Sequence, residues 1–189
     1  MPFEKKPTLS FANTRIAFAA KSNTALRKAN VLFALMSKKT LVNLSATLAE
    51  TALHWKLPVN PIIKYTIYEQ FCGGENLRQT QKVVDLLAAH KVSTFLDYGV
   101  EAKINEKDFD NTVEKVIEAI AYAAQQNVIP AVSSKITGLA RFDLLEKVHQ
   151  NKVLNAKEKA AYQRVKQRLH RLCQTALQSN TAIYFDAEE

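Results

Sequence analysis

The chain has few of the features that mark secreted, metal-binding or membrane-spanning proteins. Its 189 residues include only two cysteines, Cys72 and Cys173, which form no CxxC pair, so neither a disulfide framework nor a zinc site is expected. It has no run of 18 or more apolar residues, which argues against a membrane-spanning helix. The opening, with Pro2 and Glu4, does not follow the order of a secretory signal. We expect a reduced intracellular protein, either cytoplasmic or peripheral on the inner face of a membrane.

Several familiar catalytic and nucleotide-binding motifs are also missing. The sequence contains no GxSxG, no GxxxxGK[ST] and no GxGxxG, so nothing indicates a nucleophile elbow, a P-loop or a dinucleotide-binding turn. The four histidines fall on predicted helices or at their ends, which favours surface or capping roles over catalysis. The pair Gly73-Gly74 indicates a change of chain direction and no more.

Positive charge is concentrated in the first third of a chain whose composition is otherwise ordinary for a globular protein. The net charge is +8, and residues 1–64 carry ten Lys or Arg against two Glu, so the remaining residues are neutral overall. A basic segment that is also rich in leucine and valine suits an anionic membrane surface. A helical arm that packs on the protein with a solvated lysine face is the more general use of such a stripe. Nucleic acid is disfavoured, because the basic residues alternate with aliphatic rather than aromatic side chains.

The spacing of apolar residues predicts helices through most of the chain. Residues 24–55 form one long helix or two helices with a break near Ser37, and Pro58 and Pro61 then mark a linker. Further helices are expected at 62–71, 76–91, 105–125, 142–148 and 156–178.

Three short apolar or β-branched segments, at 93–98, 128–135 and the C-terminal end, alternate with these helices and are predicted strands. Alternating strands and helices with right-handed crossovers give neighbouring parallel strands. We predict an α/β fold in which residues 1–64 are a basic helical arm. Residues 65–189 would form the opening three units of a TIM-like (β/α)8 barrel, which three strands are too few to close.

Each predicted strand ends in a charged side chain, and these are Asp97, Lys135 and Asp186. Strand ends of a parallel barrel face one mouth, where catalysis occurs, so the three side chains are expected to converge. A lysine there suits a small anion such as a carboxylate, and two flanking carboxylates would keep the ammonium protonated. The alternative is a set of salt bridges without a ligand. No metal is expected.

Several segments, in order and spacing, resemble the monofunctional proline dehydrogenases. The similar blocks lie at 11–18, 70–75, 96–101, 135–148 and 185–189, and together they span nearly the whole chain. The resemblance implies a distorted β/α barrel that holds FAD and oxidises L-proline to 1-pyrroline-5-carboxylate. It also implies hydride transfer to the flavin and a membrane quinone as electron acceptor. By the same resemblance Lys135 grips the substrate carboxylate, Asp186 belongs to the active site and Asp97 is the strand-one aspartate.

The later strands of that family, which carry most of its FAD contacts, have no counterpart in this chain. We therefore expect a truncated portion that is inactive alone. The inner sheet face, with Phe95, Val132 and Tyr184, would lack its opposite wall, so association with itself or a completing chain is expected. The alternative function is a noncatalytic helical interaction protein or a peripheral membrane-binding protein.

Overall fold

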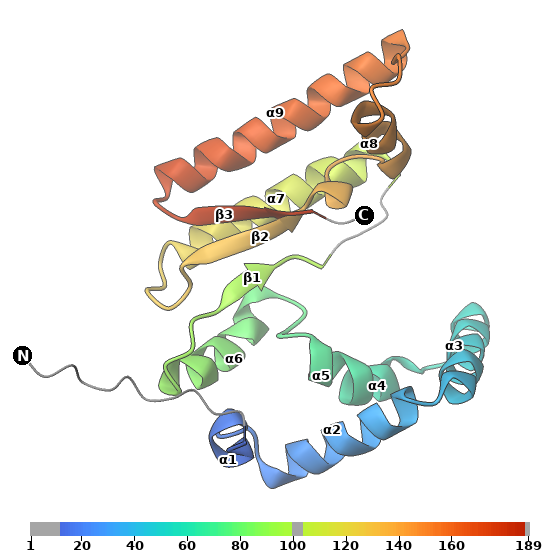
Figure 1. Cartoon of the computed structure of the whole chain (residues 1–189), viewed down its shortest axis with the longest axis vertical. Helices are drawn as coiled ribbons and strands as arrows, with labels where there is room; N and C mark the ends of the chain where they lie inside the picture. Colours follow the sequence, from blue (N-terminus) through green and yellow to red (C-terminus); the bar gives the residue numbers. More distant parts are fainter. Residues whose placement is uncertain (1–11, 100–103, 188–189) are drawn as a thin grey trace, which may run out of the picture. The chain divides into compact units, whose positions relative to one another are not determined.

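The computed structural model describes residues 12–99 and 104–187 (Figure 1). The fold is mixed α/β, mostly helical, with one small parallel sheet. The chain divides into two compact units, the first ending at Leu86 and the second beginning at Leu87. The expected boundary between a basic arm and a barrel portion at residue 64 stays a prediction.

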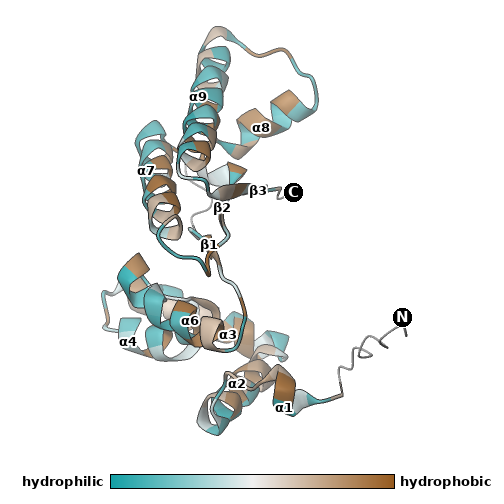
Figure 2. Ribbon diagram, turned by 90° about the vertical axis from the view of Figure 1, so that its left-hand side faces the viewer, coloured by the Kyte–Doolittle hydropathy of each residue, from teal (hydrophilic) through white to brown (hydrophobic). Residues whose placement is uncertain are grey.

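The described part of the first unit is built from helices alone (Figure 2). They are α1 (Thr14–Ala17), α2 (Asn23–Met36), α3 (Lys39–His54), α4 (Asn60–Ile63), the π-helix η1 (Lys64–Tyr68), α5 (Glu69–Phe71) and α6 (Leu77–Ala89). The hydroxyl oxygen of Ser22 caps α2 by accepting a hydrogen bond from the backbone N–H of Ala25, at 3.1 Å. The predicted break near Ser37 is confirmed, because α2 ends at Met36 and α3 begins at Lys39.

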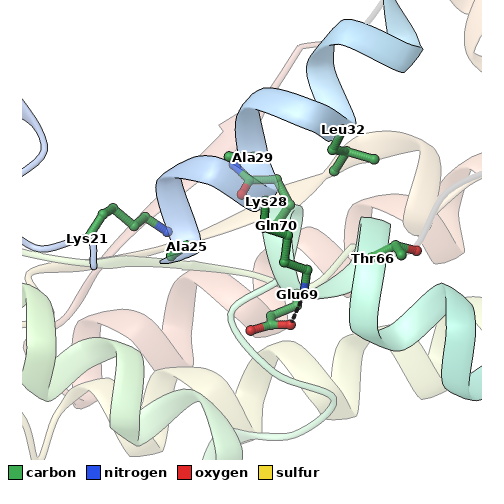
Figure 3. Close-up of a pocket in the computed structure, with 8 residues that line it drawn as sticks. All are labelled: Lys21, Ala25, Lys28, Ala29, Leu32, Thr66, Glu69 and Gln70. Atoms are coloured by element: carbon green, nitrogen blue, oxygen red, sulfur yellow. Dashed lines mark hydrogen bonds and ion pairs between the residues drawn. The ribbon is translucent and has the colours of Figure 1, made fainter. Parts of the chain in front are cut away.

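One face of α2 packs on the η1 and α5 segment (Figure 3). Lys28 forms an ion pair with Glu69, and its ammonium lies 3.4 Å from the ring centroid of Tyr65. Phe33 and Phe71 meet edge to face with ring centroids 5.9 Å apart. The pocket between these segments has a volume of about 60 Å³, which holds a few water molecules but no larger ligand.

The second unit contains a three-stranded sheet in the order β1–β2–β3, with both pairs of strands parallel (Figure 1). The strands are β1 (Phe95–Asp97), β2 (Ala131–Lys135) and β3 (Ala182–Asp186). The helices are α7 (Glu106–Ala123), α8 (Phe142–His149) and α9 (Ala156–Gln178). A short 3-10 turn, η2 (Ile136–Gly138), follows β2. Asn155 and Glu158 form a reciprocal capping box at the start of α9. The order of these elements along the chain confirms the expected alternation of strands and helices.

The two faces of the sheet differ in burial. Helices α7 and α9 pack on one face, as expected, where Leu96, Val132 and Ser134 are buried. Phe95 and Tyr184 lie on the other face, and each remains 56% exposed. The placement of Val132 beside Phe95 and Tyr184 was wrong. Side chains alternate along a strand, and Val132 pairs in register with Leu96, so it faces the helices.

A buried arginine, Arg168, ties α9 to α7 and to the segment that follows β2. Its side chain is only 6% exposed and donates hydrogen bonds to Asp110, at 2.8 Å, and to the backbone carbonyl of Leu139, at 3.2 Å. It also forms an ion pair with Glu106 and lies over the ring of Phe109. A buried guanidinium that satisfies several acceptors is costly to remove, because the acceptors lose their donor together.

The substitution Arg168→Met is therefore expected to lower the free energy of unfolding by about 2 to 3 kcal/mol. Arg171, on the same helix, provides the control, because it forms an ion pair with Glu114 in which both side chains are 53% exposed. Arg171→Met should cost less than about 1 kcal/mol. Urea unfolding of both variants measures the difference, and equal losses would contradict the assigned role of Arg168.

Glu106 should make the stability of the α7–α9 contact depend on pH in the acidic range. The hydrogen bond from Arg164 and, next, the contacts with Arg168 lower the pKa of Glu106 from 4.5 to about 2, against an opposing effect of burial. Its stabilising contribution is therefore complete above the unfolded value and is lost as the pH falls from about 4.5 through about 2. Because the side chain is 44% exposed, we expect about 1 kcal/mol. Glu106→Gln should flatten the pH dependence of urea unfolding over this range.

Candidate active site at the strand ends

The three charged residues predicted from the sequence each end a strand. Asp97 is the last residue of β1, Lys135 of β2 and Asp186 of β3. Lys135 and Asp186 are register partners, whereas Asp97 lies opposite Ser133, two residues before Lys135. Register partners share a face, as do residues two apart, so all three charged residues belong to the face opposite the helices. The structure thus makes Lys135 and Asp186 immediate neighbours and sets Asp97 one strand away and further back.

An aromatic pair lies on the same face. The rings of Phe95 in β1 and Tyr184 in β3 stack with centroids 5.5 Å apart and an interplanar angle of 20°. Ala131 and Ser133 are their register partners in β2, and these small side chains let the rings meet across the central strand. We call these two rings the aromatic floor.

Sequence reasoning named the aromatic floor only as part of the inner face and did not identify Ser133. Ser133 is half-buried and lies in register between Asp97 and Tyr184, at the centre of the face that carries the candidate site. The signal that could have found it is the two-residue period of β2, which places Ser133 on the same face as Lys135.

The charges of the site are accessible to water in this chain. Lys135 is half-buried, and Asp97 and Asp186 are exposed. An ion pair is weak in water and becomes several times stronger in a low-dielectric cavity. The arrangement can therefore hold a small carboxylate firmly only when further protein covers this face.

The face that carries the candidate site does not enclose a ligand in the described residues. The aromatic floor offers an apolar surface for a planar ring, but Phe95 and Tyr184 are each 56% exposed, so the face does not enclose a bound group. In residues 12–99 and 104–187, no cluster of three His, Cys, Asp or Glu could hold a metal ion. Of the helices formed by these residues, none has the length and hydrophobicity needed to cross a membrane.

A second pocket, of about 530 Å³, lies in the first unit beside η1 and the glycine pair. Lys64 and Glu75 form an ion pair there at 2.7 Å, and the hydrogen bond from Lys64 lowers the pKa of Glu75. Burial, followed by nearby Cys72 and Glu75, raises the pKa of Tyr68. These contacts belong to the pocket wall, which Cys72 also lines.

The glycine pair lies in a bend between α5 and α6, as the sequence suggested, and Gly74 also meets a packing requirement. Neither Gly73 nor Gly74, both among the described residues, has a positive φ. A Cβ on Gly74 would lie 2.8 Å from the backbone nitrogen of Thr80 and 2.9 Å from the Cβ of Gln79. Gly74 is therefore needed for close packing against the start of α6.

Comparison with known proteins identifies related sequences for this region. A sequence model of the family described as "Proline dehydrogenase" matches residues 80–189, which include all three strands. "Proline dehydrogenase 1, mitochondrial" of Caenorhabditis elegans is 34% identical over 133 residues, which is 68% of this chain and 22% of that protein. Its namesake in Dictyostelium discoideum is 34% identical over 93 residues, 49% of this chain and 16% of that protein.

A protein with a different name is also similar. "Carbapenem antibiotics biosynthesis protein CarD" of Pectobacterium carotovorum subsp. carotovorum is 27% identical over 119 residues, 63% of this chain and 32% of that protein. The chain thus spans between 16% and 32% of the length of these three relatives.

Proposed function

Because this chain belongs to the proline dehydrogenase family, we propose that it forms the opening part of a β/α barrel. The completed barrel oxidises L-proline to 1-pyrroline-5-carboxylate. The observation that carries this proposal is the family match over residues 80–189, which extends through every strand end of the candidate site. Since the chain covers about a fifth of the Caenorhabditis elegans relative, we assign the activity to a completed barrel rather than to this portion alone.

In the proposed site Lys135 binds the carboxylate of proline. Its ammonium is the compact, strongly charged donor that such a group requires, and its position at the end of β2 places it beside the aromatic floor. Asp186, its register partner in β3, would favour the charged form of Lys135 and limit its movement. Asp97 lies further from Lys135 in register, and we propose for it a supporting role at the same mouth.

Proline oxidation to this product removes a hydride from one ring carbon next to nitrogen, the one that does not carry the carboxylate. It also removes a proton from nitrogen. FAD, when bound, would supply the hydride acceptor, and a quinone would then take the electrons. The groups of this chain contribute by position: one end of the substrate is fixed by charge and the ring is held against an apolar surface. No protein nucleophile is needed for this chemistry.

The proposal can be tested on a completed barrel, made by joining this chain to the matching C-terminal portion of the Caenorhabditis elegans relative. L-proline should reduce an artificial electron acceptor dye when the hybrid carries flavin. A flavin-loaded hybrid that fails to oxidise proline would contradict the proposed function. A hybrid without flavin would instead indicate that the junction does not form the cofactor site.

A further inference from the structure

Within the first unit, helix α3 exposes an apolar stripe. We define the α3 stripe as Leu41, Leu44, Leu48 and Trp55, whose side chains are 40%, 57%, 60% and 72% exposed. No residue of α3, which lies wholly within the described part of the chain, is classed as buried. Helix α2 also has no buried residue, but its Ala25, Ala29 and Leu32 line the contact with η1 and α5.

The sequence of α3 separates apolar from polar side chains. Residues three, four and seven apart fall on one side of an α-helix, which places the members of the stripe together. Asn43, Thr47, Glu50 and His54 form a separate polar side of the helix at the same kind of spacing. With 16 residues, α3 is too short to cross a bilayer but long enough to lie along one.

Positive charge surrounds the stripe. Residues 12–64 contain eight Lys or Arg and a single acidic residue, Glu50. Lys38 and Lys39 lie at the start of α3, and Lys56 directly follows Trp55. Lysines at both ends of an apolar stripe suit a bilayer whose headgroup layer is negatively charged and whose interior is apolar. The aliphatic stems of the lysines can pack on the apolar layer while their ammonium groups stay among the headgroups.

We propose that α3 binds an anionic lipid bilayer by inserting the α3 stripe at the level of the headgroups. A second copy of the chain is a poorer partner, because pairing two stripes would bring the lysines at their ends into proximity and their charges would repel. Trp55, at the end of the stripe, has the amphipathic ring that is enriched at membrane interfaces. This inference concerns attachment and is independent of proline oxidation.

The fluorescence of Trp55 reports directly on this contact, because it is the one tryptophan of the chain. The full 189-residue chain would be titrated with vesicles of equal parts phosphatidylglycerol and phosphatidylcholine, and with vesicles of phosphatidylcholine alone. The proposal predicts a shift of the emission to shorter wavelength with the anionic vesicles and little change with the neutral ones. High salt should weaken the response, because it screens the lysines.

A pair of matched double variants separates the stripe from charge in general. Leu44→Asp with Leu48→Asp places two carboxylates on the stripe, whereas Asn43→Asp with Thr47→Asp places them on the polar side at the same spacing. Both doubles have the same net charge, and the substituted side chains are exposed, so circular dichroism should report similar helix content. We expect the first double to weaken vesicle binding at least about tenfold more than the second.

Equal weakening by both doubles would overturn the proposal, since binding would then follow net charge alone. It would also be overturned if Trp55 already emitted at short wavelength without lipid and did not respond to anionic vesicles. In that case a concentration-dependent mass in sedimentation that is lost with Leu44→Asp and Leu48→Asp, but kept with Tyr184→Lys, would identify a second copy as the partner that covers the stripe.

Discussion

The 189-residue chain, purified with excess FAD, is expected to retain no stoichiometric flavin and to show no proline-dependent dye reduction. The sheet has only three strands, and in the described residues β1 and β3 each have a single neighbouring strand. The face that carries the candidate site is exposed at the aromatic floor, so a flavin placed there would remain largely in water. An absorbance spectrum and a dye-reduction assay test this expectation.

The same open face should make the isolated chain associate. Phe95 and Tyr184 expose adjacent aromatic surface on a sheet with unpaired edges, which favours contact with another chain. Sedimentation velocity should show a species larger than the monomer, and Tyr184→Lys should reduce it. A monomeric chain that binds one flavin would contradict the expectation, because the described sheet would then suffice as a cofactor site.

The second large effect is expected from Lys135→Met in a completed barrel. If Lys135 binds the substrate carboxylate, its loss should raise KM for proline and lower kcat/KM by a factor of roughly 30 to 1,000. This factor corresponds to a loss of about 2 to 4 kcal/mol of transition-state stabilisation. Flavin content should hardly change, because the groups proposed to hold the cofactor lie mainly in later strands. Steady-state kinetics and the flavin-to-protein ratio measure both effects.

Two control variants sharpen this test. Lys135→Arg keeps the charge but changes the donor geometry, and it should recover part of the affinity that Lys135→Met loses. Lys152→Met removes an exposed lysine that lies outside the strands, and it should leave KM close to that of the parent. Loss of flavin with normal proline affinity in the remaining loaded enzyme would assign Lys135 to the cofactor instead.

Local sequence signals predicted the elements of the second unit well. The residues of α9 are those expected, 156–178, since a run of strong helix formers begins directly after Asn155, the cap. All three strands end at the charged residue that the sequence indicated. These features depend on residues that are close in sequence, where propensity, spacing and capping act together.

Features that depend on residues far apart were not predictable in the same way. The position of Val132 on the helix-covered face follows from its register with Leu96, which the sequence of β2 alone does not reveal. The contacts of Arg168 join α9 to residues about 30 and 60 positions earlier, and a lysine- and arginine-rich helix gives no sign that one arginine is buried.

The measurement that tests the account most directly compares L-proline with pyrrolidine, which is the same ring without the carboxylate. In the completed barrel the ratio of the two kcat/KM values reports how much the carboxylate contributes to the transition state. If Lys135 binds the carboxylate, the parent should strongly prefer proline, and Lys135→Met should reduce that preference by a factor of about 30 or more. An unchanged ratio in a flavin-loaded Lys135→Met variant would contradict the assignment of the substrate carboxylate to the end of β2.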